Sequence, residues 1–227
     1  MPFPDLSDRL REIRDRVDAA VRRGGHGQAV TIVAVTKTHG PDAVQAAWDA
    51  DIQDVGENRV QEALPKMDAV SVPVRWHLIG HLQRNKVKSL AKFDLLHSLD
   101  SSRLADAVNA FGLGANTTVK SLMQINVVGE DTKGGYAPAD WDREAERLRA
   151  LAGVRVTGVM TMAPLDADEP TLRSTFSGAR RARDILCAAG HEATELSMGM
   201  SSDYEVAVEE GATYIRLGTI LFGARPA

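Results

Sequence analysis

The sequence predicts an α/β fold, a single (β/α)₈ TIM barrel with an extra helix at its N-terminus. Apolar runs of strand length alternate with segments of helical periodicity, giving eight strand–helix units within about 200 residues, the usual size of such barrels. The strand segments are continuously apolar, as expected for a parallel sheet covered on both faces. Spacing alone does not prove closure, so an open doubly wound sheet is the alternative. No linker divides the chain, and residues 1–227 are expected to form one domain.

The opening segment is expected to be helical, because Leu6, Leu10, Ile13 and Val17 recur at three- and four-residue spacing and residues 24–27 then form a glycine-rich turn. Strands are expected at 30–35, 52–55, 74–79, 93–99, 118–126, 154–162, 193–196 and 213–217. Helices are expected at 41–50, 59–67, 82–91, 101–111, 140–151, 171–188 and 203–209, with residues 220–223 closing the chain. Pro41 suits a first helical turn, and Ser101 is a plausible N-cap.

Composition excludes several classes of protein. The net charge of −4 offers no basic face for a nucleic acid. No apolar stretch approaches the roughly 20 residues of a membrane span, and the N-terminus lacks the layout of a signal peptide. A soluble cytoplasmic protein is therefore expected, without a membrane or nucleic-acid partner. Cys187 is the only cysteine, which rules out an internal disulfide, and it is expected to be a buried core thiol.

Barrel proteins place their functional groups at the carboxyl ends of the strands. In chain order these positions give Lys37, Glu57, Asn58, His77, Gly80, His81, Asp100, Asn126, residues 160–162, residues 197–201, Arg216, Gly218 and Thr219. The set contains an amine and a guanidinium but no paired-carboxylate or metal-ligand pattern, so no metal site is predicted. Lys37 continues a buried strand, where desolvation lowers the pKa of an amine and frees it for attack on a carbonyl. The alternative is a lysine that reaches out to solvent.

The loops after the seventh and eighth strands often hold a phosphate in barrels. Ser201 precedes a short helix, so its hydroxyl and nearby N–H groups can face an anion. Gly218 and Thr219 let backbone N–H groups approach the same anion, although an N-cap serine and a strand-end glycine are also common structural features. Arg216, inside the last strand, needs a partner. That partner is either a carboxylate, from Glu57 or Asp100, or the ring nitrogen of a ligand.

Five motifs are similar to those of one known family, the pyridoxal phosphate homeostasis proteins. They are Val33-Ala-Val-Thr-Lys-Thr38, Gly56-Glu-Asn58 with Val60-Gln-Glu62, Trp76-His-Leu-Ile-Gly80 with Leu82-Gln-Arg-Asn-Lys86, Leu196-Ser-Met-Gly-Met-Ser-Ser-Asp203 and Arg216-Leu-Gly-Thr-Ile-Leu-Phe-Gly-Ala-Arg225. They occur in the family's order and cover essentially the whole chain. Departures are small. His81 stands where proline is common in the family, and Met198 and Tyr204 are not the commonest choices.

The resemblance implies a barrel like the N-terminal domain of alanine racemase that binds pyridoxal 5′-phosphate (PLP). It implies a Schiff base on Lys37, phosphate ligands at Ser201, Gly218 and Thr219, Arg216 against the pyridine nitrogen, and Asn58 and His77 lining the pocket. It further implies a role in intracellular vitamin B6 homeostasis without robust catalysis, with PLP-dependent apo-enzymes as possible recipients. We expect a monomer, and a mobile cover over the site at residues 126–136, where Lys133 precedes two glycines.

The main alternative is a PLP-dependent amino-acid racemase or decarboxylase on the same barrel. Racemases of the alanine type need a second base, a tyrosine from an additional β-domain of the partner subunit. The sequence given ends at Ala227, directly after the eighth strand, and none of Tyr136, Tyr204 and Tyr214 matches that role. This favours the homeostasis protein. A plainer third interpretation is a phosphate-binding barrel that forms no Schiff base.

Overall fold

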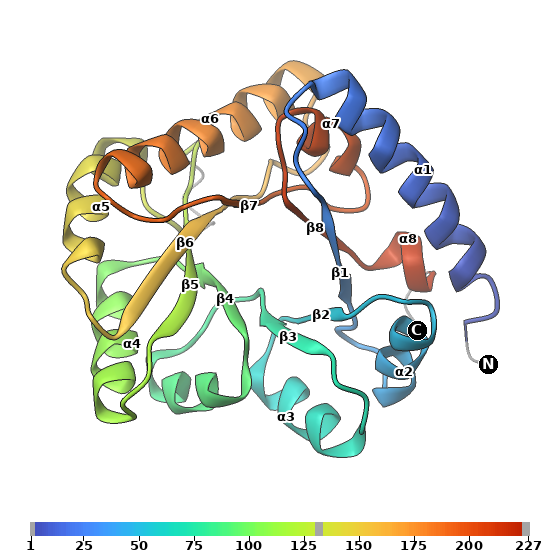
Figure 1. The fold of residues 1–227 in the computed structure, drawn as a ribbon, viewed down its shortest axis with the longest axis horizontal. Coiled ribbons are helices and arrows are strands. Elements are labelled where there is room, and N and C mark those ends of the chain that lie inside the picture. The colour runs from blue at the N-terminus through green and yellow to red at the C-terminus, as the bar shows by residue number, and fades with distance from the viewer. Residues whose placement is uncertain (1–2, 130–133, 224–227) are drawn as a thin grey trace.

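Eight parallel strands close into a barrel in the computed structural model, which describes residues 3–129 and 134–223 (Figure 1). The strands are β1 (Thr31–Val35), β2 (Asp54–Glu57), β3 (Arg75–Leu78), β4 (Leu95–Leu99), β5 (Val119–Gln124), β6 (Val154–Met160), β7 (Glu195–Ser197) and β8 (Tyr214–Leu217). They follow one another around the barrel in chain order, and β8 returns to pair with β1. The predicted (β/α)₈ barrel is confirmed, and the open-sheet alternative is wrong.

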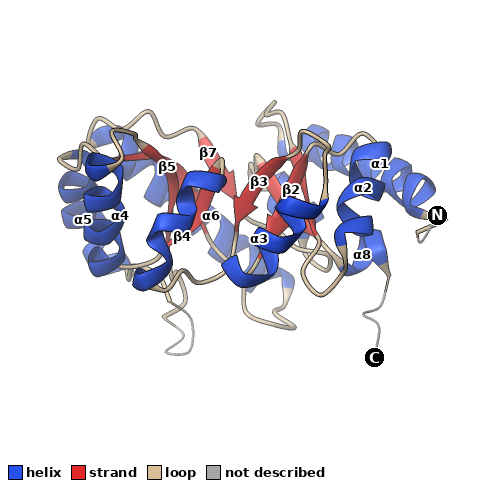
Figure 2. Ribbon diagram, turned by 90° about the horizontal axis from the view of Figure 1, so that it is seen from below, coloured by secondary structure: helices blue, strands red, loops and turns tan. Residues whose placement is uncertain are grey.

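The helices form a ring outside the strands, as Figure 2 shows. They are α1 (Leu6–Gly24), α2 (Pro41–Asp49), α3 (Val60–Ala69), the 3₁₀ helix η1 (Arg84–Lys92), α4 (Ser102–Gly114), the 3₁₀ helix η2 (Pro138–Asp140), α5 (Trp141–Arg149), α6 (Glu169–Ala188), α7 (Tyr204–Glu209) and α8 (Thr219–Phe222). Ser101 caps α4 as predicted, its hydroxyl accepting from the amide of Leu104. The extra helix α1 packs on α7 and α8, so it covers the part of the ring where the chain ends.

Two local features differ in detail or in kind from the prediction. The segment expected to be helical at 82–91 is a helix, Arg84–Lys92, but of the 3₁₀ type. Its buried residues Val87 and Leu90 are three positions apart, which matches the three residues per turn of that helix. Cys187 is exposed rather than buried, because the last turn of α6 points Leu186 into the core and its neighbour outward.

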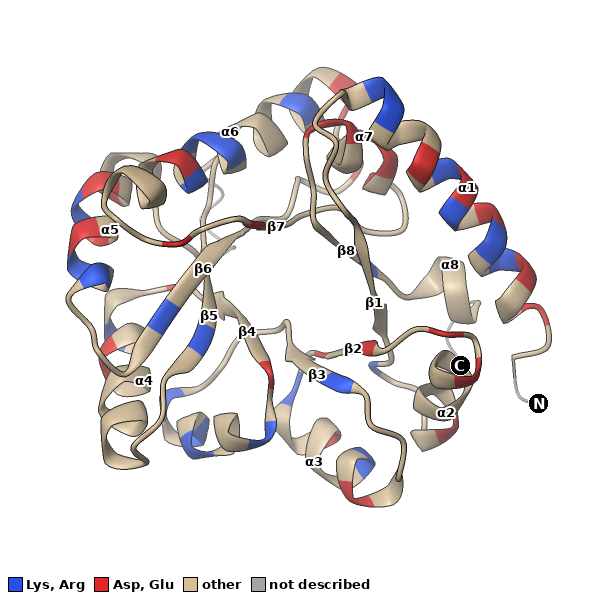
Figure 3. Cartoon of the chain, in the orientation of Figure 1, with Lys and Arg blue, Asp and Glu red and all other residues tan. Residues whose placement is uncertain are grey.

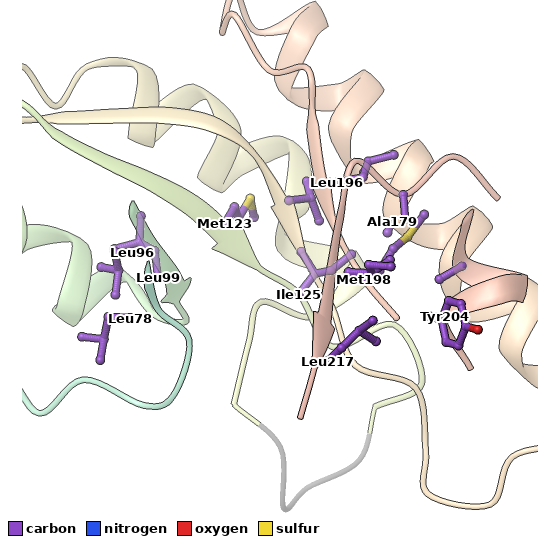
Figure 4. Close-up of a cluster of buried hydrophobic side chains, with 14 of the residues drawn as sticks. Leu78, Leu96, Leu99, Met123, Ile125, Ala179, Leu196, Met198, Tyr204 and Leu217 are labelled. Atoms are coloured by element: carbon purple, nitrogen blue, oxygen red, sulfur yellow. The ribbon is translucent and has the colours of Figure 1, made fainter. Parts of the chain in front are cut away.

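The main apolar core lies between the strands and the surrounding helices. Figure 4 shows part of it, where side chains such as Leu196 and Met198 from the β7 segment lie near Ala179 of α6 and Tyr204 of α7. The barrel interior is filled differently. One part of it holds the apolar side chains Leu95, Leu122 and Met160. Buried polar residues occupy other interior positions: Asp54, His77, His97, Ser197 and Arg216. The continuously apolar strands of the prediction therefore do not extend to all interior positions.

Charged residues gather on the outer helices, as Figure 3 shows for α1, α5 and α6. Glu209 of α7 binds Arg23 of α1 at 2.5 Å and Arg173 of α6 at 2.6 Å, so one carboxylate links three helices. Within residues 3–129 and 134–223, no helix combines the length and apolar character that a membrane crossing requires.

Close packing of β6 against β7 generates a first prediction. A Cβ on Gly158 would lie 1.9 Å from the carbonyl oxygen of Glu195, a backbone atom that cannot move without disturbing the strand pair. We expect Gly158→Ala to lower the free energy of unfolding by about 2–3 kcal/mol, measured by urea denaturation. The matched control is Gly114→Ala at the end of α4, where a Cβ meets nothing within 4 Å. That variant should be unchanged or slightly more stable. Equal unfolding midpoints for the two variants would contradict the packing argument.

Candidate functional site

A cavity of about 820 Å³ opens at the carboxyl ends of the strands. Its volume falls within the roughly 300–1,000 Å³ of small-molecule sites. Six predicted binding residues line it: Lys37, Asn58, Ser201, Arg216, Gly218 and Thr219. Residues that were not singled out as binding residues also line it, among them His39, Ile79, Gln124, Met162 and Ser202. Most of these residues could not be predicted from the sequence, because ordinary apolar and amide side chains become site residues only through their position in the fold.

Lys37 lies two residues after the end of β1 and is half-buried at the cavity wall. The residue before it, Thr36, is fully buried and held at two points. Its hydroxyl donates to Glu57 Oε1 at 2.5 Å, and its carbonyl oxygen accepts from Lys66 Nζ at 2.7 Å. The backbone then turns into α2 through Thr38, whose φ of 69° is left-handed. The strand end that presents the Lys37 amine is thus tied to β2 and α3.

Glu57 and Lys66, which together clamp Thr36, form a buried ion pair. This pair was not predicted from the sequence. Lys66 Nζ lies 2.6 Å from Glu57 Oε1, with side-chain exposures of 8% and 0%. Breaking such a pair is costly, because the remaining charge loses its counter-charge without gaining water. A lysine on a helix nine residues after a strand-end glutamate resembles any solvated residue, so the pair is visible only in the tertiary structure.

Beside the end of β1, which pairs with β8, the loops after β7 and β8 are joined by a hydrogen bond. The amide of Ile220, in the first turn of α8, donates to Ser201 Oγ at 3.4 Å. Gly199 makes the preceding turn possible: its φ is 93°, and a Cβ there would lie 2.6 Å from the Cβ of Ala207. Gly218 is the N-cap of α8 and Thr219 its first residue. The first amides of a helix have no helical acceptor, so they are available to an anion.

The space around Gly218 fits a bound anion. The three atoms nearest to a Cβ at this position would all belong to Val35, at ordinary contact distances of 3.4 Å or more. The protein around it therefore does not require glycine, whereas a side chain would fill part of the cavity that Gly218 lines. The missing side chain leaves the backbone open to a ligand. This arrangement, with the Ser201 hydroxyl beside it, suits a phosphate group.

Arg216 is 4% exposed on β8 and also lines the cavity. Its Nη1 donates to Ser197 Oγ at 2.7 Å and its Nη2 to the carbonyl oxygen of Thr161 at 2.9 Å. These bonds use two of the five N–H donors of a guanidinium. Burial lowers the pKa of Arg216 to about 10, which leaves it charged at neutral pH.

The carboxylate partners considered for Arg216 are both engaged elsewhere. Glu57 binds Lys66, and Asp100 Oδ2 lies 2.7 Å from His81 Nδ1 at the rim of the cavity. Among the described residues, Arg216 forms no ion pair within 4 Å: it is hydrogen-bonded to the Ser197 hydroxyl and the Thr161 carbonyl, and Asp203 acts on it only through its charge. A buried cation without a carboxylate in direct contact is a ready site for an acceptor on a ligand.

The structure places His77 apart from the other six predicted residues. It is 2% exposed in the barrel interior, hydrogen-bonded to Asp54 and His97, and the cavity lining among the described residues does not include it. Its position near a strand end and the family resemblance predicted a pocket residue, but its side chain lies in the barrel interior, beneath the cavity.

His39, by contrast, lines the cavity. Burial, together with the charge of Lys66, lowers the pKa of His39.

The segment 126–136 is described only at its two ends. Gly134 lines the cavity and its carbonyl oxygen accepts from Gln124 Nε2 at 2.8 Å, so the returning end of this segment lies at the cavity mouth. Lys133, which belongs to the predicted cover, lies outside the described residues.

Comparison with known proteins gives close relatives along the whole chain. A family model described as "Alanine racemase, N-terminal domain" matches residues 9–226. A protein of Aquifex aeolicus named pyridoxal phosphate homeostasis protein is 40% identical, the alignment covering 96% of this chain and 97% of that protein. A protein of the same name from Pseudomonas aeruginosa is 35% identical, with 97% and 96% covered.

Solved structures agree with these relatives. The structure of PipY from Synechococcus elongatus with PLP bound superposes with a TM-score of 0.85 and 35% identity, covering 96% of this chain and 100% of that chain. Alanine racemase from Corynebacterium glutamicum matches with a TM-score of 0.71 at 16% identity, covering 94% of this chain and 62% of that chain. This second likeness concerns the fold alone.

The clamp beneath Lys37 generates the second prediction. Lys66→Met leaves Glu57 buried without its cation, so we expect the free energy of unfolding to fall by about 3–5 kcal/mol. The control is Lys92→Met, which removes the exposed pair with Asp68 at 2.9 Å and should cost at most about 1 kcal/mol. Urea denaturation of both variants measures the difference. Similar losses for the two pairs would show that the buried pair does not hold the strand end.

Proposed function

Because this chain belongs to the pyridoxal phosphate homeostasis protein family, we propose that it binds pyridoxal 5′-phosphate in the cavity at the barrel mouth and acts in intracellular vitamin B6 homeostasis. One observation carries the proposal. The same cavity is lined by a lysine, by a buried arginine and by two loops whose backbone amides are accessible to a ligand. These groups match the aldehyde, the ring nitrogen and the phosphate of that cofactor.

Each residue has a distinct role in this proposal. Lys37 supplies the amine for the Schiff base, on a strand end fixed by Glu57 and Lys66. Ser201 and the amides of Gly218 and Thr219 hold the phosphate, and Asn58 lines the pocket beside the cofactor. When bound, the cofactor supplies an electron sink for chemistry at an amino group.

Arg216 donates to the ring nitrogen in the same proposal. A fixed positive charge there disfavours a second one, so it keeps that nitrogen unprotonated. An unprotonated ring is a poorer electron sink than a protonated one. The guanidinium therefore favours holding the cofactor over using it.

The alternative is a racemase or decarboxylase. Alanine-type racemization needs a tyrosine base near the bound substrate, yet Tyr136 and Tyr204 are buried in the core between barrel and helices, and Tyr214 starts β8 in the barrel interior. None of the three lines the described cavity. Incubation of the pure protein with single L-amino acids, followed by an assay for the D-isomer and for amine products, separates the functions. Steady turnover at ordinary enzyme rates would favour the enzyme.

A carrier role completes the proposal. A Schiff base is reversible, and the cavity opens at the barrel mouth, so the cofactor can leave for PLP-dependent apo-enzymes. We propose that this occurs in the cytoplasm, from a monomer.

Lys37→Ala tests the amine directly. The variant should lose the visible near-violet absorption of the Schiff base, since no amine remains in its place, while far-UV circular dichroism stays unchanged because Lys37 lies outside the packed layers. The control is Lys88→Ala on the exposed side of η1, which should keep the band. Borohydride reduction and peptide mapping should find the label on Lys37 in the wild type. A label elsewhere would refute the assignment.

Ser201→Ala tests the phosphate side. Loss of one hydrogen bond to a charged group, worth roughly 1.5–3 kcal/mol, should raise the dissociation constant of the cofactor about tenfold to a hundredfold. Titration of the apoprotein followed by absorbance measures it. Ser174→Ala on the exposed face of α6 is the matched control and should bind like the wild type. Unchanged affinity in Ser201→Ala would remove this residue from the phosphate site.

A further inference from the structure

A continuous chain of hydrogen bonds crosses the barrel interior beneath the cavity. Asp54 Oδ1 lies 2.8 Å from His77 Nε2, His77 Nδ1 lies 2.8 Å from His97 Nε2, and His97 Nδ1 lies 2.8 Å from Ser197 Oγ. Arg216 Nη1 then donates to the same Ser197 oxygen at 2.7 Å. All five residues are at most 4% exposed. The chain begins at the first residue of β2, at the end of the barrel opposite the cavity, and finishes at a residue that lines the cavity.

The two ends of this chain have fixed roles, because a carboxylate only accepts and a guanidinium only donates. His77 therefore donates from Nε2 to Asp54, and Arg216 donates to Ser197 Oγ. Between them the bonds have two consistent arrangements. Either His97 Nε2 donates to His77 Nδ1 and the Ser197 hydroxyl donates to His97 Nδ1, or His77 Nδ1 donates to His97 Nε2 and His97 Nδ1 donates to Ser197 Oγ. In both arrangements the Ser197 oxygen accepts from Arg216.

The electrostatic surroundings agree with an ionised acceptor end and a neutral His97. Burial, followed by the charges of His77 and Arg216, holds the pKa of His97 well below its usual value. Burial alone would raise the pKa of Asp54, but hydrogen bonds from His77 and Arg75 outweigh it and lower that pKa. Asp54 is thus ionised and His97 uncharged at neutral pH.

Packing also holds the two imidazole rings in place. Their centroids are 5.1 Å apart, and the ring of Tyr214 lies edge-on to both, at 5.7 Å from His77 and 5.8 Å from His97. Rings packed in this way do not flip freely, so each nitrogen keeps its partner.

A buried polar group needs hydrogen bonds in any case, so satisfaction alone would not assign a function. What distinguishes this chain is its last member. Among the described residues no carboxylate lies within ion-pair distance of Arg216, and Asp203 acts on it only as a charge farther away. The guanidinium is held by the Ser197 hydroxyl, which belongs to the chain, and by the Thr161 carbonyl oxygen. The Ser197 oxygen has two lone pairs, so it accepts from Arg216 while it is also hydrogen-bonded to His97.

We infer that Ser197, His97, His77 and Asp54 are positioning residues, which hold the Arg216 guanidinium so that its remaining N–H donors face the ring nitrogen of the bound cofactor. This inference rests on the proposed function for its ligand, but the chain itself does not. It also gives His77 a role, since that residue acts from beneath the cavity without lining it.

The chain is tested first in the cofactor-free protein. Long-range ¹H–¹⁵N correlation spectra of histidine-labelled wild type should show His77 protonated at Nε2, His97 as a neutral ring, and a proton on one of the two facing nitrogens, His77 Nδ1 or His97 Nε2, at neutral pH. A charged His97, a bare His77 Nε2, or protons on both or neither of the facing nitrogens would overturn the inference. This measurement needs no cofactor and no variant, so it stands even if the proposed function fails.

The effect on Arg216 is tested in the loaded protein by Ser197→Ala. We expect the dissociation constant of PLP to rise about tenfold, as for one lost bond to a charged group, and the visible band to shift as the ring nitrogen changes its protonation. The matched control is Ser121→Ala, another serine with 0% exposure, whose hydroxyl donates to the carbonyl oxygen of Val119 on its own strand. It should keep the wild-type band and affinity.

The outcomes separate the two proposals. A wild-type band and affinity in Ser197→Ala, with the variant folded by circular dichroism, would overturn the positioning role. Equal changes in Ser197→Ala and Ser121→Ala would reduce the effect to general loss of packing, which also overturns it. A wild type that binds no PLP would refute the proposed function, and with it the role toward the ring, while the nitrogen spectra would still decide the chain.

Discussion

Parallel pairing of β1 with β8 is the constraint on which the rest of this structure depends. Val33 is in register with Arg216 and Ala34 with Leu217, so strands from opposite ends of the sequence become neighbours. This closure sets the amine that follows β1 beside the guanidinium and the glycine cradle of β8. A sheet left open at that seam would expose two edges and would separate Lys37 from Gly218 by the width of the sheet. The cavity exists because the barrel is closed.

Closure creates an interior, and the interior has to be filled. In this barrel apolar side chains fill one part, while a line of polar groups fills another. Buried polar groups are tolerable only when every one is paired. The hydrogen-bond chain from Asp54 to Arg216 satisfies that condition, with an acceptor carboxylate at one end and a donor guanidinium at the other. The same requirement for pairing thus stabilises the core and fixes the orientation of a site residue.

Charge is managed in a similar way around Lys37. The Glu57–Lys66 pair is neutral as a unit, so it clamps the strand end without adding net charge to the cavity. Arg216 is the contrasting case. It is a buried cation whose hydrogen-bond partners among the described residues, the Ser197 hydroxyl and the Thr161 carbonyl, are uncharged. The field inside the cavity therefore favours an anionic ligand with an acceptor in its ring, which fits the cofactor that the family name of the relatives specifies.

The order of strands and helices, a (β/α)₈ fold class and six of the residues at the cavity could be predicted from the sequence. Periodicity, strand-end position and short motifs along the chain carry this information, whereas spacing left an open sheet as an alternative to closure. Tertiary contacts established the closure, the side chains that face inward and the groups that they contact. The pairing of Glu57 with Lys66, the interior position of His77, the 3₁₀ geometry of Arg84–Lys92 and the exposure of Cys187 all depend on neighbours from other elements. Interactions between residues 20 to 100 positions apart, such as those of His97 with His77 and Ser197, leave no pattern in the sequence around either partner.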